Sequence, residues 1–190
     1  MKKTNITKSV LTRAARIKLL LMDVDGVLTD SKVYFLPDPA GGWTETKGFD
    51  SQDGIALQWL HWKGIQTGVI SGRKSPAVEM RAEQGHMTYC YQGHIEKIPI
   101  LEEILAKSGV RPEEVGYVGD DLTDVVLFRR VGLAVAVANG RPEVKKAAHY
   151  VTKAPGGAGA VREAAELILR AQGHWKGLLE KYEIKPVRSK

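Results

Sequence analysis

The segment at residues 19–30 constrains this chain more than any other part of its sequence. Four apolar residues, Leu19–Met22, lead directly into Asp23, Asp25 and Gly26. A short apolar run of this kind predicts a strand that is buried on both faces, as in a parallel sheet. Where the strand ends and the chain turns, the two carboxylates can converge on one point. Two neighbouring anions repel each other unless a cation or a shared proton offsets the repulsion, and a hard divalent cation such as Mg²⁺ prefers oxygen ligands.

The size and composition predict one soluble globular domain at residues 1–190, with a core at about 17–171 and basic tails at both ends. The chain has 190 residues, of which 43% are hydrophobic and 26% are charged. A domain of this length buries about 70% of the surface that its unfolded chain exposes. The formal net charge is +6, and much of the excess lies near the ends, at Lys2, Lys3, Lys8, Arg13, Arg16, Lys18, Lys181, Lys185, Arg188 and Lys190. We interpret these ends as solvated tails.

The sequence also disfavours several classes of partner and location. No interleaving of aromatic and basic residues and no helix-turn-helix spacing stands out, so we expect no nucleic-acid partner. No apolar stretch is long enough to span a membrane, and the N-terminus lacks the apolar core of a signal peptide. The single cysteine, Cys90, excludes an intramolecular disulfide and fits a reducing, cytoplasmic location. Its apolar neighbours predict a buried structural thiol.

Strands and helices are expected to alternate along the chain. The predicted strands cover residues 19–22, 65–70, 88–91, 115–118, 133–137 and 149–151, and the predicted helices cover 55–62, 75–84, 98–107, 122–130 and 161–171. This order predicts the α/β class, with a doubly wound, mostly parallel sheet that carries helices on both faces. One segment breaks the alternation: two β-prone runs, 33–35 and 43–46, flank a turn rich in proline and glycine. We expect a β-hairpin there, which is either a flap over the acidic loop or a decoration of the sheet edge.

Polar side chains follow the predicted strands at their carboxyl ends, where open α/β sheets bind their ligands. The set consists of Asp23 and Asp25 after the first strand, Ser71 after the second, Lys97 after the third, and Asp120, Asp121 and Asp124 after the fourth. Several carboxylates, a hydroxyl and an ammonium group at one sheet edge suit phosphoryl transfer.

Each of these groups has a role in such a reaction. We expect Asp23 to attack phosphorus and form an acyl phosphate, and Asp25 to act as general acid and base. Asp120 with Asp23 would hold Mg²⁺, which offsets the repulsion between carboxylate and phosphate. Ser71 and Lys97 would bind the phosphate oxygens and stabilise their charge.

Each residue also has a simpler interpretation. Asp23 and Asp25 could cap the segment that follows them, and Ser71 could cap the next helix. Lys97 could be a solvated lysine at a helix start. Asp121 and Asp124 could favour the helix dipole, and Arg73 and Arg81 could be ordinary surface residues. The phosphoryl-transfer hypothesis depends on the ordered occurrence of the polar groups at successive strand ends.

The same residues resemble the signature of the haloacid dehalogenase superfamily of phosphatases. Its four motifs occur in order, as Asp23-Val24-Asp25-Gly26-Val27-Leu28-Thr29-Asp30, Ser71, Lys97, and Gly119-Asp120-Asp121-Leu122-Thr123-Asp124. The resemblance covers nearly the whole chain and implies a Rossmann-like fold with Asp23 as nucleophile and Asp25 as acid and base. It further implies a metal held by Asp23, Asp120 and the backbone carbonyl of Asp25. Asp121 and Asp124 would then contact the metal ligands and not the metal itself.

Further segments resemble the 3-deoxy-D-manno-octulosonate 8-phosphate phosphatase family in particular. They include Ile70-Ser71-Gly72-Arg73, Tyr91-Gln92-Gly93 and Gly156-Gly157-Ala158-Gly159. This resemblance implies a Mg²⁺-dependent phosphatase of lipopolysaccharide precursor synthesis that has no large cap domain and assembles as a homotetramer. It also implies that an anionic sugar phosphate is contacted by Phe49, Asp50, Ser51, Gln52, Asp53 and Gly54, with Arg73 and Arg81 on its anionic portion and Asp25 and Lys97 at the phosphate.

The sequence departs from the family pattern at two positions and leaves alternatives open. Gln52 stands where an arginine is common and Ala56 where a glycine is common. A phosphatase for a nine-carbon acidic sugar 9-phosphate is therefore an alternative, although relatives of that kind often carry an acid in place of Arg73. A phosphorylatable receiver-like signalling domain is an alternative of another class. A catalytically idle scaffold or nucleic-acid binder is a further one.

Overall fold

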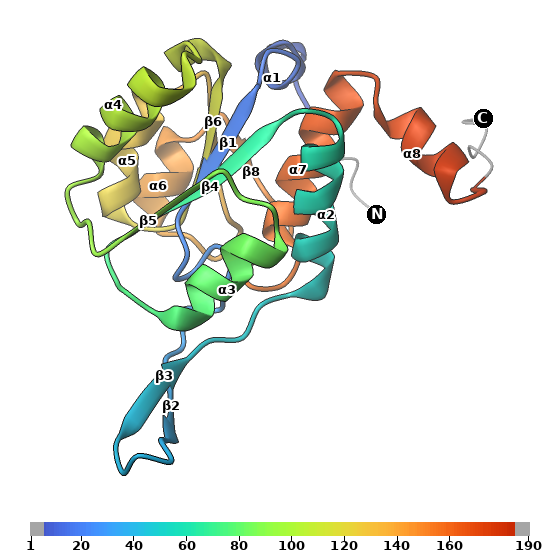
Figure 1. Ribbon diagram of the computed structural model, residues 1–190. Helices are drawn as coiled ribbons and strands as arrows, with labels where there is room; N and C mark the ends of the chain where they lie inside the picture. The colour runs from blue at the N-terminus through green and yellow to red at the C-terminus, as the bar shows by residue number, and fades with distance from the viewer. Residues whose placement is uncertain (1–5, 185–190) are drawn as a thin grey trace.

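The computed structural model describes residues 6–184, and a six-stranded parallel sheet forms its centre (Figure 1). The sheet order is β5-β4-β1-β6-β7-β8, and every neighbouring pair of strands is parallel. The strands are β1 (Leu19–Met22), β4 (Gln66–Ser71), β5 (Tyr89–Gln92), β6 (Val115–Gly119), β7 (Leu133–Ala136) and β8 (Tyr150–Val151). This architecture confirms the predicted doubly wound α/β fold.

Helices cover both faces of the sheet. They are α1 (Lys8–Ala14), α2 (Ser51–Trp62), α3 (Pro76–Gln84), α4 (Lys97–Ser108), α5 (Leu122–Phe128), α6 (Pro142–Ala147), α7 (Ala160–Ala171) and α8 (Trp175–Lys181), with a 3₁₀ turn at Pro112–Glu114. Alternation along β1 explains the two cores. Leu20 and Met22 pack with α1, α2 and α7, whereas Leu19 and Leu21 pack with α4, α5 and α6. Because all four residues of β1 are buried between these layers, the loop that follows β1 starts from a rigid position.

Near both ends, the described part of the chain forms a helix that packs against the body, where solvated tails were predicted. Thr7 caps α1 through a hydrogen bond from the Val10 N–H to its side-chain oxygen, and Val10 and Ala14 are buried beneath α7. Near the other end, α8 buries Leu178. The sequence did not predict α1, α6 or α8, because each has only six or seven residues and offers little periodicity. The basic residues Lys2, Lys3, Lys185, Arg188 and Lys190 lie outside the described residues.

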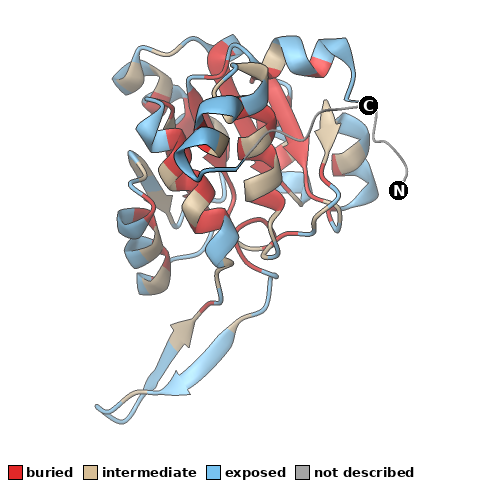
Figure 2. Cartoon of the chain, turned by 90° about the vertical axis from the view of Figure 1, so that its right-hand side faces the viewer, coloured by how far each residue is buried: buried red, intermediate tan, exposed pale blue. Residues whose placement is uncertain are grey.

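The predicted hairpin is confirmed, and it extends from the carboxyl edge of the sheet away from the body (Figures 1 and 2). Strand β2 (Tyr34–Pro37) pairs antiparallel with β3 (Trp43–Thr46), and Tyr34 lies opposite Thr46. All four residues of β2 are exposed, including Phe35 at 58% of its surface. Among residues 6–184, this hairpin is what stands between β1 and α2, where a large cap domain would have its place.

Two further expectations can be compared with the structure. Cys90 lies on the edge strand β5 and is exposed, so the prediction of a buried thiol is wrong. None of the four residues of β5 is fully buried, because this strand lies at the edge of the sheet, where the flanking helices cover it less completely. Within the described part of the chain, none of the helices has the length and apolar character that crossing a membrane requires.

A glycine-rich loop, residues 155–159, supports the loop that follows β1. The Gly157 N–H donates to the Val27 carbonyl oxygen at 3.0 Å, and the Gly156 N–H donates to the Asn139 side chain at 2.8 Å. A Cβ atom at Gly156 would lie 1.7 Å from the Gly26 carbonyl oxygen, closer than any real contact. Only glycine therefore allows the two backbones to approach so closely.

We expect Gly156→Ala to lower the free energy of unfolding by about 2 kcal/mol or more, because the new methyl group forces the two loops apart. Gly177→Ala in α8 is the matched control, since a Cβ atom there meets nothing within 4 Å. Alanine favours helices over glycine by up to about 1 kcal/mol, so this control should keep or raise stability. Urea unfolding followed by circular dichroism measures both. Equal stability of the two variants would contradict this account.

Candidate active site

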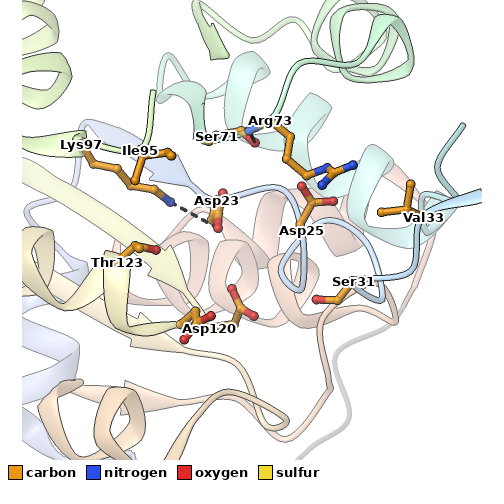
Figure 3. A pocket seen from close by; sticks show the side chains of 12 residues that line it. Asp23, Asp25, Ser31, Val33, Ser71, Arg73, Ile95, Lys97, Asp120 and Thr123 are labelled. Atoms are coloured by element: carbon orange, nitrogen blue, oxygen red, sulfur yellow. Dashed lines mark hydrogen bonds and ion pairs between the residues drawn. The ribbon is translucent and has the colours of Figure 1, made fainter. Parts of the chain in front are cut away.

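A pocket of about 290 Å³ opens at the carboxyl ends of β1, β4 and β6 (Figure 3). Its lining combines acidic, basic and hydroxyl side chains from separate parts of the chain: Asp23, Asp25, Ser31, Val33, Ser71, Gly72, Arg73, Ile95, Lys97, Asp120, Asp121 and Thr123. All four residues predicted to be catalytic are in this set. The structure therefore brings together groups that lie up to about a hundred positions apart in the sequence.

Asp23 follows β1 directly and is nearly buried at the floor of the pocket. Its Oδ1 accepts a hydrogen bond from the Val24 N–H at 2.7 Å, and its Oδ2 lies 3.2 Å from the Lys97 Nζ. Burial raises the pKa of Asp23 to about 6, although the ammonium group of Lys97 acts in the opposite direction. The carboxylate is thus held between two donors, with its charge poorly solvated.

Lys97 is the first residue of α4, and its side chain is only 2% exposed. Its Nζ donates to Asp124 Oδ1 at 2.7 Å and to the Tyr117 hydroxyl at 3.1 Å. Burial alone would lower the pKa of Lys97, but the carboxylates of Asp124 and Asp23 outweigh burial and raise it. The simpler interpretation of Lys97 as a solvated lysine is therefore wrong.

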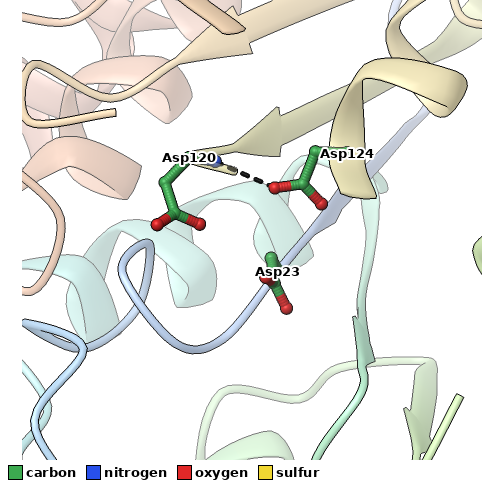
Figure 4. Close-up of side chains that lie close together, drawn as sticks. All are labelled: Asp23, Asp120 and Asp124. Atoms are coloured by element: carbon green, nitrogen blue, oxygen red, sulfur yellow. Dashed lines mark hydrogen bonds between the residues drawn. The ribbon is translucent and has the colours of Figure 1, made fainter. Parts of the chain in front are cut away.

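Asp124 contacts both the basic and the acidic parts of the site, and Figure 4 shows its side chain near Asp120 and Asp23. Its side chain is fully buried, and Oδ1 accepts from Lys97 and, at 2.9 Å, from the Tyr117 hydroxyl. Its Oδ2 accepts from the backbone N–H groups of Asp120 and Asp121, at 2.9 and 3.2 Å. Asp121 is itself the N-cap of α5, as the helix-dipole interpretation implied, and its Oδ1 accepts from the Leu122 N–H.

The carboxylates of Asp23, Asp120 and Asp124 form a cluster that fits a divalent cation. One oxygen from each lies within 4.8 Å of the others. Because four donors already occupy the oxygens of Asp124, Asp23 and Asp120 are the residues with oxygens left for a metal. Oδ1 of Asp120 is buried without a hydrogen-bond partner. Burial and the neighbouring carboxylates of Asp124 and Asp23 raise the pKa of Asp120 to about 7, so an anionic Asp120 requires a compensating cation.

The loop that follows β1 passes close to Asp120 because it contains a glycine. Gly26 has a φ angle of +92°, and a Cβ atom there would lie 2.1 Å from Asp120 Oδ2. Because Gly26 has no side chain, the loop can pass directly beside the Asp120 carboxylate. The predicted ligand role of the Asp25 backbone carbonyl stays a prediction.

Figure 3 shows Ser71 and Arg73 across the pocket from Asp120, with Asp23 and Asp25 between them. Ser71 ends β4 and is 2% exposed, and its Oγ accepts from the Arg73 N–H at 3.3 Å. The N-cap of α3 is Ser75, so the simpler interpretation of Ser71 as that cap is wrong. Asp25 is partly exposed, and its Oδ1 forms an ion pair with Lys47.

Sequence reasoning missed Lys47, which follows β3 at the base of the hairpin. Its side chain has no exposed surface, and its Nζ pairs with Asp25 and, at 3.2 Å, with Glu45 Oε1. Glu45 Oε2 in turn accepts from Arg73 Nη2 at 2.7 Å. A lysine and a glutamate two positions apart are common on exposed hairpins, so nothing in the sequence pattern indicates this role. Tyr117 was missed as well, although a tyrosine within the apolar strand β6 is a signal for a buried polar partner.

Several residues predicted to contact the substrate lie outside this pocket. Asp53 is a correction: its side chain is fully buried and its Oδ1 accepts from the Arg162 N–H at 2.7 Å, so it joins α2 to the start of α7. Phe49 and Arg81 line a different cavity, between the hairpin and α3, where Arg81 donates to the Asp50 carbonyl oxygen at 2.6 Å. Asp50, Ser51, Gln52 and Gly54 are likewise not among the lining residues, because this segment turns into the start of α2.

Comparison with known proteins agrees with this geometry. Residues 74–162 match the haloacid dehalogenase-like hydrolase family. The chain is 41% identical over 172 residues, 90% of either chain, to the 3-deoxy-D-manno-octulosonate 8-phosphate phosphatase of Yersinia pestis. The crystal structure of that enzyme from Yersinia pestis superposes with a TM-score of 0.84, at 42% identity and 90% coverage of both chains.

Two further solved structures contain a metal. The 3-deoxy-D-manno-octulosonate 8-phosphate phosphatase of Moraxella catarrhalis was solved in complex with a magnesium ion, a phosphate ion and a KDO molecule. It is 36% identical, with a TM-score of 0.87 over 93% of this chain and 99% of that one. The cobalt-bound enzyme of Haemophilus influenzae is 35% identical, with a TM-score of 0.78 over 85% and 92% of the two chains.

The chain therefore belongs to the haloacid dehalogenase-like hydrolases, and within them to the 3-deoxy-D-manno-octulosonate 8-phosphate phosphatase family. As a member of this family it is a phosphoric monoester hydrolase.

We expect the stability of the metal-free protein to fall between pH 5 and pH 8. Burial raises the pKa of Asp23 and Asp53 to about 6 and that of Asp120 to about 7, from an ordinary value of 3.8. A carboxyl group with a raised pKa favours the folded state at low pH, and this contribution is lost as the pH rises from about 4 through about 7. Thermal unfolding in the presence of a chelator should show a lower Tm at pH 8 than at pH 5.

Added Mg²⁺ should raise the Tm more at pH 8 than at pH 5, because the cation binds the ionised carboxylates. In Asp120→Asn the gain at pH 8 should largely disappear, since one of the two available ligands is lost. An equal gain in the wild type and in this variant would contradict a metal site at Asp120.

Proposed function

We propose that this protein hydrolyses 3-deoxy-D-manno-octulosonate 8-phosphate to the free sugar acid and phosphate, with Mg²⁺ as cofactor. The reaction would pass through an aspartyl phosphate and would serve lipopolysaccharide precursor synthesis in the cytoplasm. The observation that carries the proposal is the meeting of Asp23, Asp25, Lys97 and Asp120 around one pocket. Identity of about 40% to enzymes of this name over about nine-tenths of the chain supports the choice of substrate.

In the first half of the proposed reaction, an oxygen of Asp23 attacks phosphorus while the bond between phosphorus and the sugar oxygen breaks. Asp25 in its acid form gives its proton to the departing sugar oxygen, a contribution of about 10²–10⁴-fold. Lys97 and Ser71 bind the remaining phosphate oxygens and stabilise their charge. Lys97 suits this role because Asp124 and Tyr117 fix its ammonium group 3.2 Å from the nucleophile.

In the second half, water attacks the phosphorus of the aspartyl phosphate. Asp25 takes the proton of this water, and the Asp23 carboxylate and phosphate are released. Asp23 and Asp120 would hold Mg²⁺, which neutralises part of the charge between the nucleophile and the phosphate. The raised pKa values of both carboxyl groups fit a site that needs such a cation.

Two of the alternatives left open by the sequence fit less well. A phosphatase for nine-carbon acidic sugars would use the same chemistry, but Arg73 lines the pocket at the position where relatives of that kind often carry an acid. A receiver domain has its acceptor carboxylate and its acidic pair on different strands, whereas Asp23 and Asp25 both follow β1. A homotetramer belongs to the same proposal, and the exposed apolar residues of the hairpin are consistent with contacts between copies.

Asp23→Asn should reduce phosphate release from the sugar-acid phosphate by roughly 10⁴-fold or more, because the amide has almost the same shape but is not a nucleophile. Release of inorganic phosphate, measured with and without Mg²⁺, tests this. Circular dichroism should show an intact fold. Undiminished turnover would refute the assignment of the nucleophile.

Arg73→Ala should raise the KM for an acidic sugar phosphate by about tenfold, because a charge-assisted hydrogen bond is lost, while a neutral sugar phosphate is affected much less. Comparing kcat/KM for eight-carbon and nine-carbon sugar-acid phosphates in the wild type decides between the two substrate classes. The same loss on acidic and neutral substrates would show that Arg73 does not contact the sugar carboxylate.

A further inference from the structure

Lys47 is a fully buried cation at the edge of the active-site pocket. An ammonium group without contact to water is costly unless anions pair with it, and Lys47 has two such partners, Asp25 and Glu45. One partner is the expected acid and base. The other belongs to β3, so the base of the hairpin reaches into the reaction centre of its own chain.

The ion pair distinguishes between the two oxygens of Asp25. Lys47 binds Oδ1, whereas the hydrogen bonds among residues 6–184 give Oδ2 no partner. The Asp25 side chain is 21% exposed and lines the pocket, so its carboxylate can reach a substrate there. A carboxylate that turned freely would present either oxygen, and a fixed one presents a single oxygen.

Glu45 in turn restricts the position of the Lys47 ammonium group. One of its oxygens lies 3.2 Å from the Lys47 Nζ, and the other accepts from Arg73 at 2.7 Å. Charges thus alternate along Asp25, Lys47, Glu45 and Arg73, and the series joins the loop after β1, the hairpin and the loop after β4. Each neighbour in the series limits the movement of the next.

We propose that Lys47 is the positioning residue for proton transfer: by holding Oδ1 of Asp25, it assigns Oδ2 as the oxygen that exchanges a proton with the substrate. The proposal rests on the proposed phosphatase function. In the first step the proton on Oδ2 goes to the sugar oxygen as its bond to phosphorus breaks and the bond from Asp23 forms. In the second step the attacking water returns a proton to Oδ2 as the bond between Asp23 and phosphorus breaks. Lys47 keeps its own protons throughout.

The test compares two esters that differ in their need for a proton. The alkoxide of a sugar is a poor leaving group and needs the acid, whereas 4-nitrophenolate leaves without one. Lys47→Met should lower kcat on the sugar-acid phosphate by about 10²-fold and change kcat on 4-nitrophenyl phosphate little. Lys47→Arg, which keeps the positive charge, should recover part of the lost activity on the sugar ester.

Lys18→Met is the matched control, because Lys18 also pairs with a carboxylate, Glu114, at 2.7 Å but lies at the opposite end of β1. It should leave both activities unchanged. Equal losses on both esters in Lys47→Met, or no loss on either, would overturn the proposal, since a merely structural role does not depend on the leaving group.

Failure of the substrate assignment can be told apart from failure of this inference. If the wild type hydrolyses other alkyl phosphates but not the sugar-acid phosphate, the proposed substrate is wrong, and the comparison of leaving groups is made with that alkyl phosphate instead.

Crystal structures of the wild type and of Lys47→Met test the positioning role independently of turnover. An Asp25 carboxylate that turns away from its position in the variant supports the proposal, and an unmoved one overturns it.

Discussion

The buried ion pair between Lys97 and Asp124 is the interaction on which the site depends. Asp124 accepts four hydrogen bonds, which orient the Lys97 ammonium group, the Tyr117 hydroxyl and the backbone at Asp120 and Asp121. Removing one partner of such a pair leaves an uncompensated buried charge, at a cost of about 3–5 kcal/mol. The contacts that hold α4, β6 and α5 together therefore also place the Lys97 ammonium group beside Asp23. Asp124 thus contributes both to the stability of the fold and to the proposed reaction.

Around this pair, charge compensation explains most of the geometry. On one side, Asp23 and Asp120 have oxygens that protein donors do not satisfy fully, and these are the oxygens that fit a metal ion. On the other side, Asp25 is satisfied by Lys47 from the hairpin. The proposed nucleophile, Asp23, and the proposed acid and base, Asp25, are only two residues apart, yet different cations lie beside them. This separation lets one carboxylate approach phosphorus while the other keeps an oxygen for a proton.

Much of this arrangement could be predicted from the sequence, because the fold follows from local patterns. The apolar run before Asp23 and the alternation of strands and helices predicted the parallel sheet, and strand ends in such a sheet must meet at one edge. Lys47 could not be found this way, since its burial comes from the packing of the hairpin base against the loop after β1. For Asp53 the prediction went wrong because a carboxylate that caps α7 from a distant helix resembles, in sequence, one that faces a ligand.

The glycine-rich loop has a consequence for the order of events during synthesis. The loop that follows β1 is synthesised early. The backbone of Gly156 and Gly157, which supports this loop, leaves the ribosome some 130 residues later. A chain that has grown only through β7 holds Asp23, Asp120 and Lys97 but lacks the glycine backbone that packs against the turn at Gly26. Reactive carboxylates therefore become ordered late, when almost all of the domain is available to enclose them.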